Sequence, residues 1–329
     1  MATPTQKQAS AARRAANRAR GRDRAHARVR ARPIHPGRSY KITRRCAGRL
    51  LLLSPGCKGE ELREFIGYCL AYAASRYGIQ VHASVWMSNH HHTDITDPHG
   101  NLVPFNQLLY SMIARGRNAQ LGRFDSFWSG DEACDTRRPT DDQALRDLVY
   151  TLTNPVKAGL VKWSSLWPGF TTADWRFGET VTFKRPNWFF DEDGSMPEKA
   201  SLTLVRPPIF RALDDDALYA RLVAEVRTRE LECQRELRGK NRRFMGLRKL
   251  ARQPWNVAPK SFEERFTITP TVAASSKWLV LAQLQRDREW EREYAAARAL
   301  LLEGKAAVFP AGTYWMRRFA RAAVAAPAP

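Results

Sequence analysis

The stretch from Val81 to Thr96, VHASVWMSNHHHTDIT, constrains the fold more than any other part of the chain. Its first seven residues alternate with a period of two, which is typical of a β-strand, so we interpret the stretch as a strand. It ends in three consecutive histidines. Because residues two apart share a face of a strand, His90 and His92 point one way and His91 the other. Two imidazoles on one rigid face predict half of a metal site, and a polar strand end with solvated histidines is the alternative.

Extended and helical patterns alternate on either side of this strand. The order predicts an α+β fold in which one antiparallel sheet is covered by helices, in the ferredoxin-like arrangement. Strands are predicted at 39–46, with a continuation at 50–53, and at Phe127-Trp128; helices are predicted at 60–77, ended by Gly78, at 105–121 and at 141–153, N-capped near Thr140; the segment 130–140 is predicted to be a polar loop.

The charge is concentrated at the two ends of the chain. The net charge is +21, of which residues 1–40 carry +10, residues 41–200 carry +1 and residues 201–329 carry +10. A pI near 10.3 favours a polyanionic partner, and the basic residues of the N-terminal end are mostly arginine, the better bidentate phosphate ligand. The sequence therefore predicts a nucleic-acid partner rather than an ordinary metabolic substrate.

Four segments follow from composition. Residues 1–38 alternate Ala and Arg with little apolar bulk, which predicts a disordered basic arm. Residues 39–175 form the predicted globular domain. Residues 176–210, rich in Pro and aromatic residues, are interpreted as a linker that packs on it. Residues 211–329 are interpreted as a basic helical accessory domain, with long helices at 214–238 and 275–303.

The sequence argues against secretion and against insertion into a membrane. The five cysteines are odd in number and none has zinc-knuckle spacing, which indicates a reducing compartment without a disulfide framework. No apolar run reaches the roughly 18 residues needed to span a bilayer, and the basic N-terminal end lacks the apolar core of a secretory signal. We therefore expect a cytoplasmic protein, associated with the bacterial nucleoid, and no membrane partner.

The third predicted helix offers residues that would complete the histidine site. Tyr150 and Asn154 are four apart and share a helical face. If that face meets His90 and His92, Asn154 supplies a third ligand and Tyr150 lies one turn away as a nucleophile. Asp94 shares the strand face of His92 and is a further candidate ligand. Singly, Tyr150 reads as a core tyrosine, Asn154 as a helix-stop residue before proline and Asp94 as a solvated carboxylate.

The mixed imidazole and oxygen ligands predict Mg²⁺ or Mn²⁺ rather than a closed zinc site. Such a cation polarises a non-bridging phosphate oxygen. A phenolate attacking that phosphate gives a covalent phosphotyrosine and a free 3′-hydroxyl, and the same site can run the reaction backwards to rejoin strands.

The motifs together resemble the REP-associated tyrosine transposases, of the His-hydrophobic-His (HUH) superfamily of single-strand DNA transposases. The resemblance lies in MSNHHH at 87–92, in Tyr150 and in NPVKAGLV at 154–161, with YKITRRC at 40–46 similar to the first strand of the family; it covers about 39–175. The sequence departs from the family at Ser88, where the family has proline, at His91, which is normally apolar, and in the polar pair after His92.

The resemblance implies a ferredoxin-like core, metal ligands at His90, His92 and Asn154, and a nucleophile at Tyr150. It implies that the substrate is single-stranded or hairpin DNA of palindromic repeats, nicked and rejoined without a nucleotide cofactor. The oligomeric state stays open, with a monomer favoured.

Basic residues outside the histidine site are candidate DNA contacts. Arg115, Arg117 and Arg123 are predicted to line the DNA entry. Trp255 is a candidate for stacking an unpaired base, with core packing as the favoured alternative. The basic residues around Trp255 are expected to clamp the strand: Arg242, Arg243, Arg248 and Lys249.

Two alternatives of different class remain. One is a non-catalytic relative that binds structured DNA or RNA, for which the basic segments suffice. The other is an adaptor with a structural zinc site, which would need thiolate ligands that the cysteine positions do not supply.

Overall fold

The centre of the fold is a four-stranded antiparallel sheet. The computed structural model describes residues 33–130, 134–137, 141–259, 272 and 276–326. The strand order is β2-β3-β1-β4, and each neighbouring pair is antiparallel. The four strands are β1 (Arg38–Arg45), β2 (Gln80–Trp86), β3 (His90–Asp97) and β4 (Cys134–Arg137). The predicted α+β class, with helices covering an antiparallel sheet, is confirmed.

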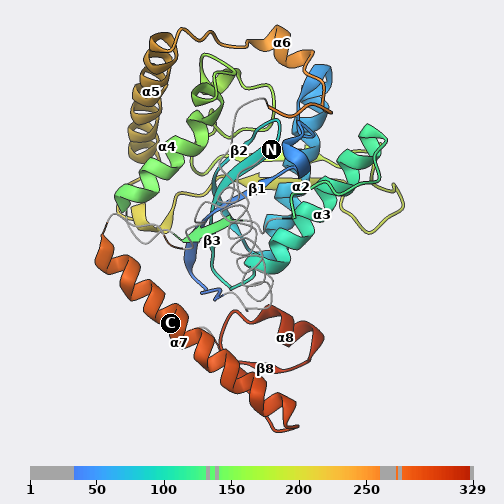
Figure 1. Cartoon of the computed structure of the whole chain (residues 1–329), viewed down its shortest axis with the longest axis vertical. Coiled ribbons are helices and arrows are strands. Elements are labelled where there is room, and N and C mark those ends of the chain that lie inside the picture. The colour runs from blue at the N-terminus through green and yellow to red at the C-terminus, as the bar shows by residue number, and fades with distance from the viewer. Residues whose placement is uncertain (1–32, 131–133, 138–140, 260–271, 273–275, 327–329) are drawn as a thin grey trace, which may run out of the picture.

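Helices lie on both faces of this sheet (Figure 1). On one face, α2 (Gly59–Tyr77) and α3 (Leu102–Leu121) enclose the main hydrophobic core, in which Phe65 and Phe105 are fully buried. On the other face, α4 (Asp141–Lys157) contacts β2 and β3. Gly78 ends α2 in the left-handed conformation with φ 67°, as the sequence predicts.

The two faces of β3 belong to different layers. Ile95 is fully buried in the core beneath α2 and α3. Asp94 points the other way and accepts a hydrogen bond from the hydroxyl of Thr151 on α4. The alternation of a strand therefore separates the odd-numbered residues of β3 from the even-numbered ones, and only the even-numbered ones face α4.

The prediction of one strand over 81–96 is wrong. The stretch is a hairpin, in which the Met87 N–H donates to the His90 carbonyl at 2.8 Å and closes the turn between β2 and β3. The turn has no glycine or proline, the residues that usually mark such a reversal in a sequence. His82 therefore lies beside the far end of β3, where its Nε2 hydrogen-bonds the Thr96 hydroxyl at 2.7 Å.

The predicted polar loop over 130–140 contains the edge strand β4, which pairs with β1. Phe127-Trp128, predicted to be a strand, makes only an isolated bridge between Trp128 and Cys46. An edge strand is held by backbone hydrogen bonds to one neighbour and does not need an apolar face, so the alternation that reveals other strands is missing. Thr140, the predicted N-cap of α4, lies outside the described residues.

α4 continues beyond its predicted end at Thr153 and includes Pro155. A proline removes one N–H, but the carbonyls of Asn154 and Pro155 still accept hydrogen bonds from Ala158 at 2.9 Å and Leu160 at 3.0 Å. The last turn is thus retained. As a result, Asn154 stays on the same helical face as Tyr150.

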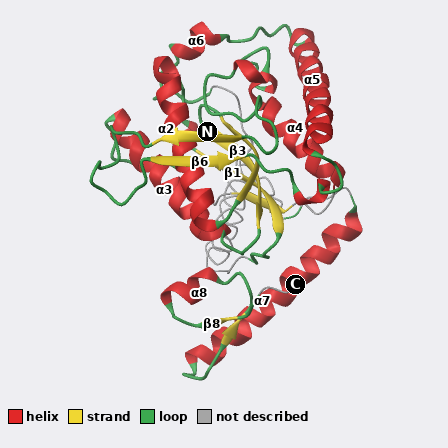
Figure 2. Cartoon of the chain, turned by 180° about the vertical axis from the view of Figure 1, so that it is seen from behind, coloured by secondary structure: helices red, strands yellow, loops and turns green. Residues whose placement is uncertain are grey.

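Much of the rest of the chain lies beside these layers, and the C-terminal elements extend below them (Figure 2). The segment interpreted as a linker forms a hairpin whose Phe183 and Leu202 lie in the main core. Ile34, inside the predicted N-terminal arm, is also buried there, and residues 1–32 of that arm lie outside the described residues. The remaining elements are β5 (Thr180–Lys184), β6 (Lys199–Thr203), α5 (Asp215–Gly239), α6 (Leu247–Ala251), α7 (Lys277–Leu302), β7 (Val308–Phe309), α8 (Tyr314–Phe319) and β8 (Ala323–Val324).

α5 packs on the outer side of α4 through a second apolar cluster that includes Leu148, Leu152 and Leu218. α4 is consequently held between the sheet and α5. Among the helices within the described ranges, none has both the length and the apolar content required to cross a bilayer.

Candidate active site

A polar strip runs along the face of the sheet that α4 covers. In the antiparallel register of β1 and β3, Arg45 is opposite His90, Thr43 is opposite His92 and Lys41 is opposite Asp94. Residues directly opposite in two strands have neighbouring side chains on the same face. The strip therefore gathers two imidazoles, a carboxylate and three other polar groups under one helix.

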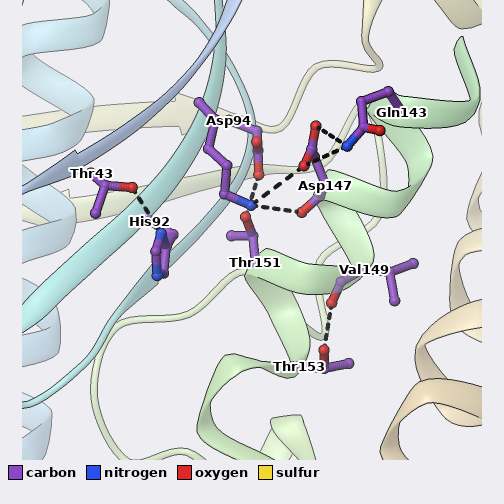
Figure 3. Close-up of polar contacts among 9 residues, drawn as sticks. Thr43, His92, Asp94, Gln143, Asp147, Val149, Thr151 and Thr153 are labelled. Carbon is purple, nitrogen blue, oxygen red and sulfur yellow. Dashed lines mark hydrogen bonds and ion pairs between the residues drawn. The ribbon is translucent and has the colours of Figure 1, made fainter. Parts of the chain in front are cut away.

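The rings of His90 and His92 lie with their centroids 5.0 Å apart and their planes at 83°. Each Nδ1 atom has a partner: Asn89 Oδ1 at 2.7 Å for His90 and the Thr43 hydroxyl at 2.8 Å for His92. Figure 3 shows Thr43 pointing at the His92 ring. A partner on one ring nitrogen fixes the ring orientation, as outer-sphere groups do for histidines that bind metals.

The tautomer of His90 follows from its neighbours. The amide nitrogen of Asn89 donates to the Arg49 carbonyl at 3.2 Å, so the amide oxygen is the atom facing His90. An amide oxygen can only accept, which places the proton of His90 on Nδ1. Nε2 of His90 then carries the lone pair, which is the form of the ring that can bind a cation.

Both histidines are held neutral. Burial lowers the pKa of His90 from 6.5 to about 4, helped by the positive charge of Arg45. Burial also holds the pKa of His92 well below its usual range, with the charges of His90 and Lys41 acting in the same direction. Only a neutral imidazole can coordinate a cation, so this protonation state fits a metal site at neutral pH.

α4 brings the two other predicted site residues to the same place. Asn154 is buried, and its side chain forms a hydrogen bond with His90 that partly opposes the lowering of the His90 pKa. The ring of Tyr150 lies 5.4 Å from that of His92 at 80°, and Tyr150 is 39% exposed. His90, His92, Asn154 and Tyr150 therefore gather as the sequence predicts, with Tyr150 partly exposed to solvent.

Asp94, predicted as a further ligand, is bound elsewhere. Asp94 is 6% exposed, and its carboxylate accepts a hydrogen bond from the Thr151 hydroxyl on α4 (Figure 3). No three His, Cys, Asp or Glu side chains within the described ranges are placed to hold a metal ion together. The interpretation of Asp94 as a ligand is corrected to a contact between β3 and α4, and a cation here would rely on His90, His92 and Asn154.

His91 belongs to the opposite layer. It is fully buried, its Nε2 lies 3.1 Å from the Tyr110 hydroxyl, and its ring stacks on Trp86 at 4.3 Å. Burial lowers its pKa to about 3. Its place on the α3 side of the sheet keeps it away from Tyr150. The alternation of side chains along β3 is therefore enough to separate His91 from His90 and His92.

Two lysines that the sequence analysis did not select lie against the nucleophile candidate. The ammonium groups of Lys41 and Lys157 are 4.2 Å and 4.6 Å from the centroid of the Tyr150 ring. The sequence contained a pattern that could have identified both lysines. Lys157 follows Tyr150 and Asn154 at the spacing i, i+4, i+7 of one helical face, and Lys41 shares its strand face with Thr43.

The predicted DNA contacts of the C-terminal part are exposed beside the site. Backbone N–H groups of Met245 and Gly246 donate to the carbonyls of Gly159 and Leu160 at 2.8 Å and 2.9 Å, which fixes the segment leading into α6 directly after the last turn of α4. The exposed basic residues on this segment and on α6 are Arg242, Arg243, Arg248 and Lys249.

The predicted contacts on α3 divide into two kinds. Arg115 is exposed, and Arg123 lies with its guanidinium 5.4 Å from the ring centroid of the half-buried Trp255. Arg117 is only 6% exposed, and its guanidinium donates to the Leu52 carbonyl at 3.0 Å. Burial lowers the pKa of Arg117 to about 10. The prediction that Arg117 contacts DNA is wrong, because this guanidinium joins α3 to the loop after β1.

Comparison with known proteins finds little. No protein-family model matches the chain, and no curated protein matches it. A solved structure described as a REP-associated tyrosine transposase bound to a REP hairpin is similar over 43% of this chain and 80% of that chain, with 21% identity and a TM-score of 0.36. A likeness at this level carries no conclusion about activity.

Proposed function

We propose that the protein is a divalent-metal-dependent enzyme that cleaves and rejoins single-stranded hairpin DNA through a covalent bond to Tyr150. The observation that carries the proposal is the meeting of two segments some sixty residues apart. His90 and His92 of β3 and the Tyr150–Asn154 face of α4 lie together, and Tyr150 is partly exposed. If Tyr150 were only a core residue and Asn154 only a helix-stop residue, nothing would require them to lie beside two neutral histidines.

The proposal includes a ferredoxin-like core. The order β2-β3-β1-β4 with α2 between β1 and β2, and α3 between β3 and β4, supports this assignment. In such an arrangement the two crossover helices share one face of the sheet and leave the other free for a site. Here that second face carries the polar strip and α4.

The residues present fit a divalent cation of the Mg²⁺ or Mn²⁺ type. His90 and His92 would hold it through ring nitrogens, and Asn154 through its amide oxygen. When bound, the cation supplies Lewis-acid polarisation of a phosphate oxygen. Asn89 and Thr43 fix the two rings, and α5 holds α4 against the sheet, so the chain itself sets the distance between ligands and phenol.

The proposed reaction is a transesterification. The phenolic oxygen of Tyr150 loses its proton to solvent and forms a bond to phosphorus, and the bond between phosphorus and the 3′ oxygen breaks. The departing 3′ oxygen takes a proton from solvent and leaves as a hydroxyl. The number of phosphoester bonds is unchanged, so attack by a 3′-hydroxyl on the phosphotyrosine reverses the step and joins strands without a nucleotide cofactor.

The exposed basic residues on α6 and on the segment before it would hold the phosphates of the strand near the site. We expect this activity in the bacterial cytoplasm, at the nucleoid. The competing possibility is a relative that binds structured DNA or RNA without cleaving it, since the same basic residues would serve that role.

A nicking assay tests the proposal. The purified full chain is incubated with a labelled hairpin oligonucleotide with single-stranded flanks, taken from the DNA around its own gene, in the presence of Mn²⁺, Mg²⁺ or EDTA. We expect metal-dependent cleavage with labelled DNA attached covalently to the protein. The attachment is read as a shifted band on a denaturing gel.

Tyr150→Phe removes only the phenolic oxygen and is expected to abolish attachment. Tyr219→Phe, a tyrosine on α5 away from the site, is the matched control and is expected to leave it unchanged. Cleavage that survives in Tyr150→Phe would show that the nucleophile is wrong. Binding without cleavage under every metal condition would favour the non-catalytic relative.

A further inference from the structure

The arrangement of two cations around one phenol ring is more than packing requires. Lys41 and Lys157 both lie within 5 Å of the centroid of the Tyr150 ring, at 4.2 Å and 4.6 Å. One cation over an aromatic ring is stabilising, and a second cation near the same ring adds repulsion between the two positive charges. An anion bound at one of the two ammonium groups would offset part of that positive charge.

The two lysines differ in what else they contact. Lys41 is 6% exposed, donates to the Asp147 carbonyl at 3.2 Å and lies 3.9 Å from the Asp147 carboxylate. These contacts fix Lys41 between β1 and α4. Its charge is already balanced inside the protein, so it serves the position of the Tyr150 ring rather than a ligand.

Lys157 has no such partner. It is exposed, it is the last residue of α4, and within the described ranges its ammonium group makes no ion pair with a carboxylate. It is carried by the helical face that carries Tyr150 and Asn154. A flexible four-carbon side chain there can leave the ring and reach an anion beside the phenol.

We propose that Lys157 binds a phosphate of the attacked DNA strand at Tyr150, and that it leaves the face of the ring to do so. The proposal rests on the proposed function, because it takes the strand cleaved by Tyr150 as the ligand. The phosphate that Lys157 binds is the scissile one or its immediate neighbour. The side chain thereby holds the phosphorus close to the phenolic oxygen.

A structural role is the competing explanation. A lysine in the last turn of a helix is favoured by the helix dipole whether or not it binds a ligand. In that case its removal would lower stability slightly and leave DNA untouched. Lys162 provides a matched control, because it is exposed, lies five residues further along and has its own aromatic partner, with its ammonium group 5.4 Å from the Trp163 ring centroid.

The experiment compares wild type, Lys157→Ala and Lys162→Ala on the labelled hairpin oligonucleotide. The rate of covalent attachment at saturating DNA and Mn²⁺ is expected to fall roughly 10- to 100-fold in Lys157→Ala, the size of a lost charge-assisted hydrogen bond, and less than about twofold in Lys162→Ala. The slope of log affinity against log salt should also shrink by about 0.7 in Lys157→Ala, as for one lost phosphate contact on a single strand.

Replacing single phosphates of the oligonucleotide by neutral methylphosphonates locates the contact. In wild type, the replacement at one phosphate next to the cleaved bond should weaken binding, and in Lys157→Ala that same replacement should have no further effect. Equal losses in both proteins at every position would overturn the proposal, as would Lys157→Ala behaving like Lys162→Ala. Absence of attachment in wild type would instead contradict the proposed function, so the two failures are distinguishable.

Discussion

The stability of the fold should fall between pH 7 and pH 5, and His82 should account for a measurable part of the loss. This histidine is 2% exposed, its Nδ1 donates to the Val205 carbonyl at 2.7 Å, and its Nε2 lies 2.7 Å from the Thr96 hydroxyl. Burial lowers its pKa from 6.5 to about 4. In the unfolded chain it binds a proton as the pH falls below 6.5, while in the folded protein it stays neutral until about pH 4.

The sign and size follow from this difference. The unfolded state binds more protons than the folded state between pH 6.5 and pH 4, so acid favours unfolding in that range. One pKa unit corresponds to about 1.4 kcal/mol, and lowering the pH from 7 to 5 therefore costs about 2 kcal/mol for this one histidine. That is a large share of the roughly 5–15 kcal/mol by which domains are stable.

The measurement is urea unfolding followed by tryptophan fluorescence, for wild type and His82→Gln at both pH values. At pH 7 the variant should be less stable by about 1–3 kcal/mol, since it loses buried hydrogen bonds. At pH 5 the gap should shrink by about 2 kcal/mol, because glutamine does not titrate. An equal gap at both pH values would refute the reasoning.

Three further predictions concern the site and its surroundings. Mn²⁺ at 100 times its dissociation constant should raise the free energy of unfolding by about 2.7 kcal/mol, and Asn154→Ala should largely remove this increase in a thermal melt. Arg117→Leu should lower the free energy of unfolding by about 1–3 kcal/mol, because carbonyl acceptors lose their donor, yet leave hairpin affinity unchanged in fluorescence anisotropy. Changing both Arg248 and Lys249 to Ala should reduce the salt slope of hairpin binding by about 1.4, and an unchanged slope would remove α6 from the DNA surface.

Local patterns in the sequence were sufficient to predict which site residues share a face of the same strand or helix. Alternation along β3 placed His90 and His92 together and His91 apart, and the spacing of four put Tyr150 and Asn154 on one face of α4. These relations depend only on the geometry of one element. The ends of α2 at Gly78 and of α3 near Leu121 were likewise predictable from local signals.

The pairing of separate elements was harder to predict from the sequence. The reversal between Met87 and His90 has no glycine or proline, and β4 is an edge strand whose short sequence, CDTR, contains no alternation of large apolar residues. In both cases the chain direction is set by pairing with β1 or β3, which lie far away in sequence. A pattern of single residues does not contain that information.

The sequence by itself determined that this chain has a mixed fold, basic ends and two same-face histidines with a tyrosine–asparagine pair to match. Only the tertiary structure decided which charged groups are available. Arg117 is held by a backbone carbonyl, Asp94 by Thr151 and Lys41 by Asp147, whereas Lys157 is left exposed. The reason is physical: a buried charge must be paired, and its partner comes from a distant part of the chain.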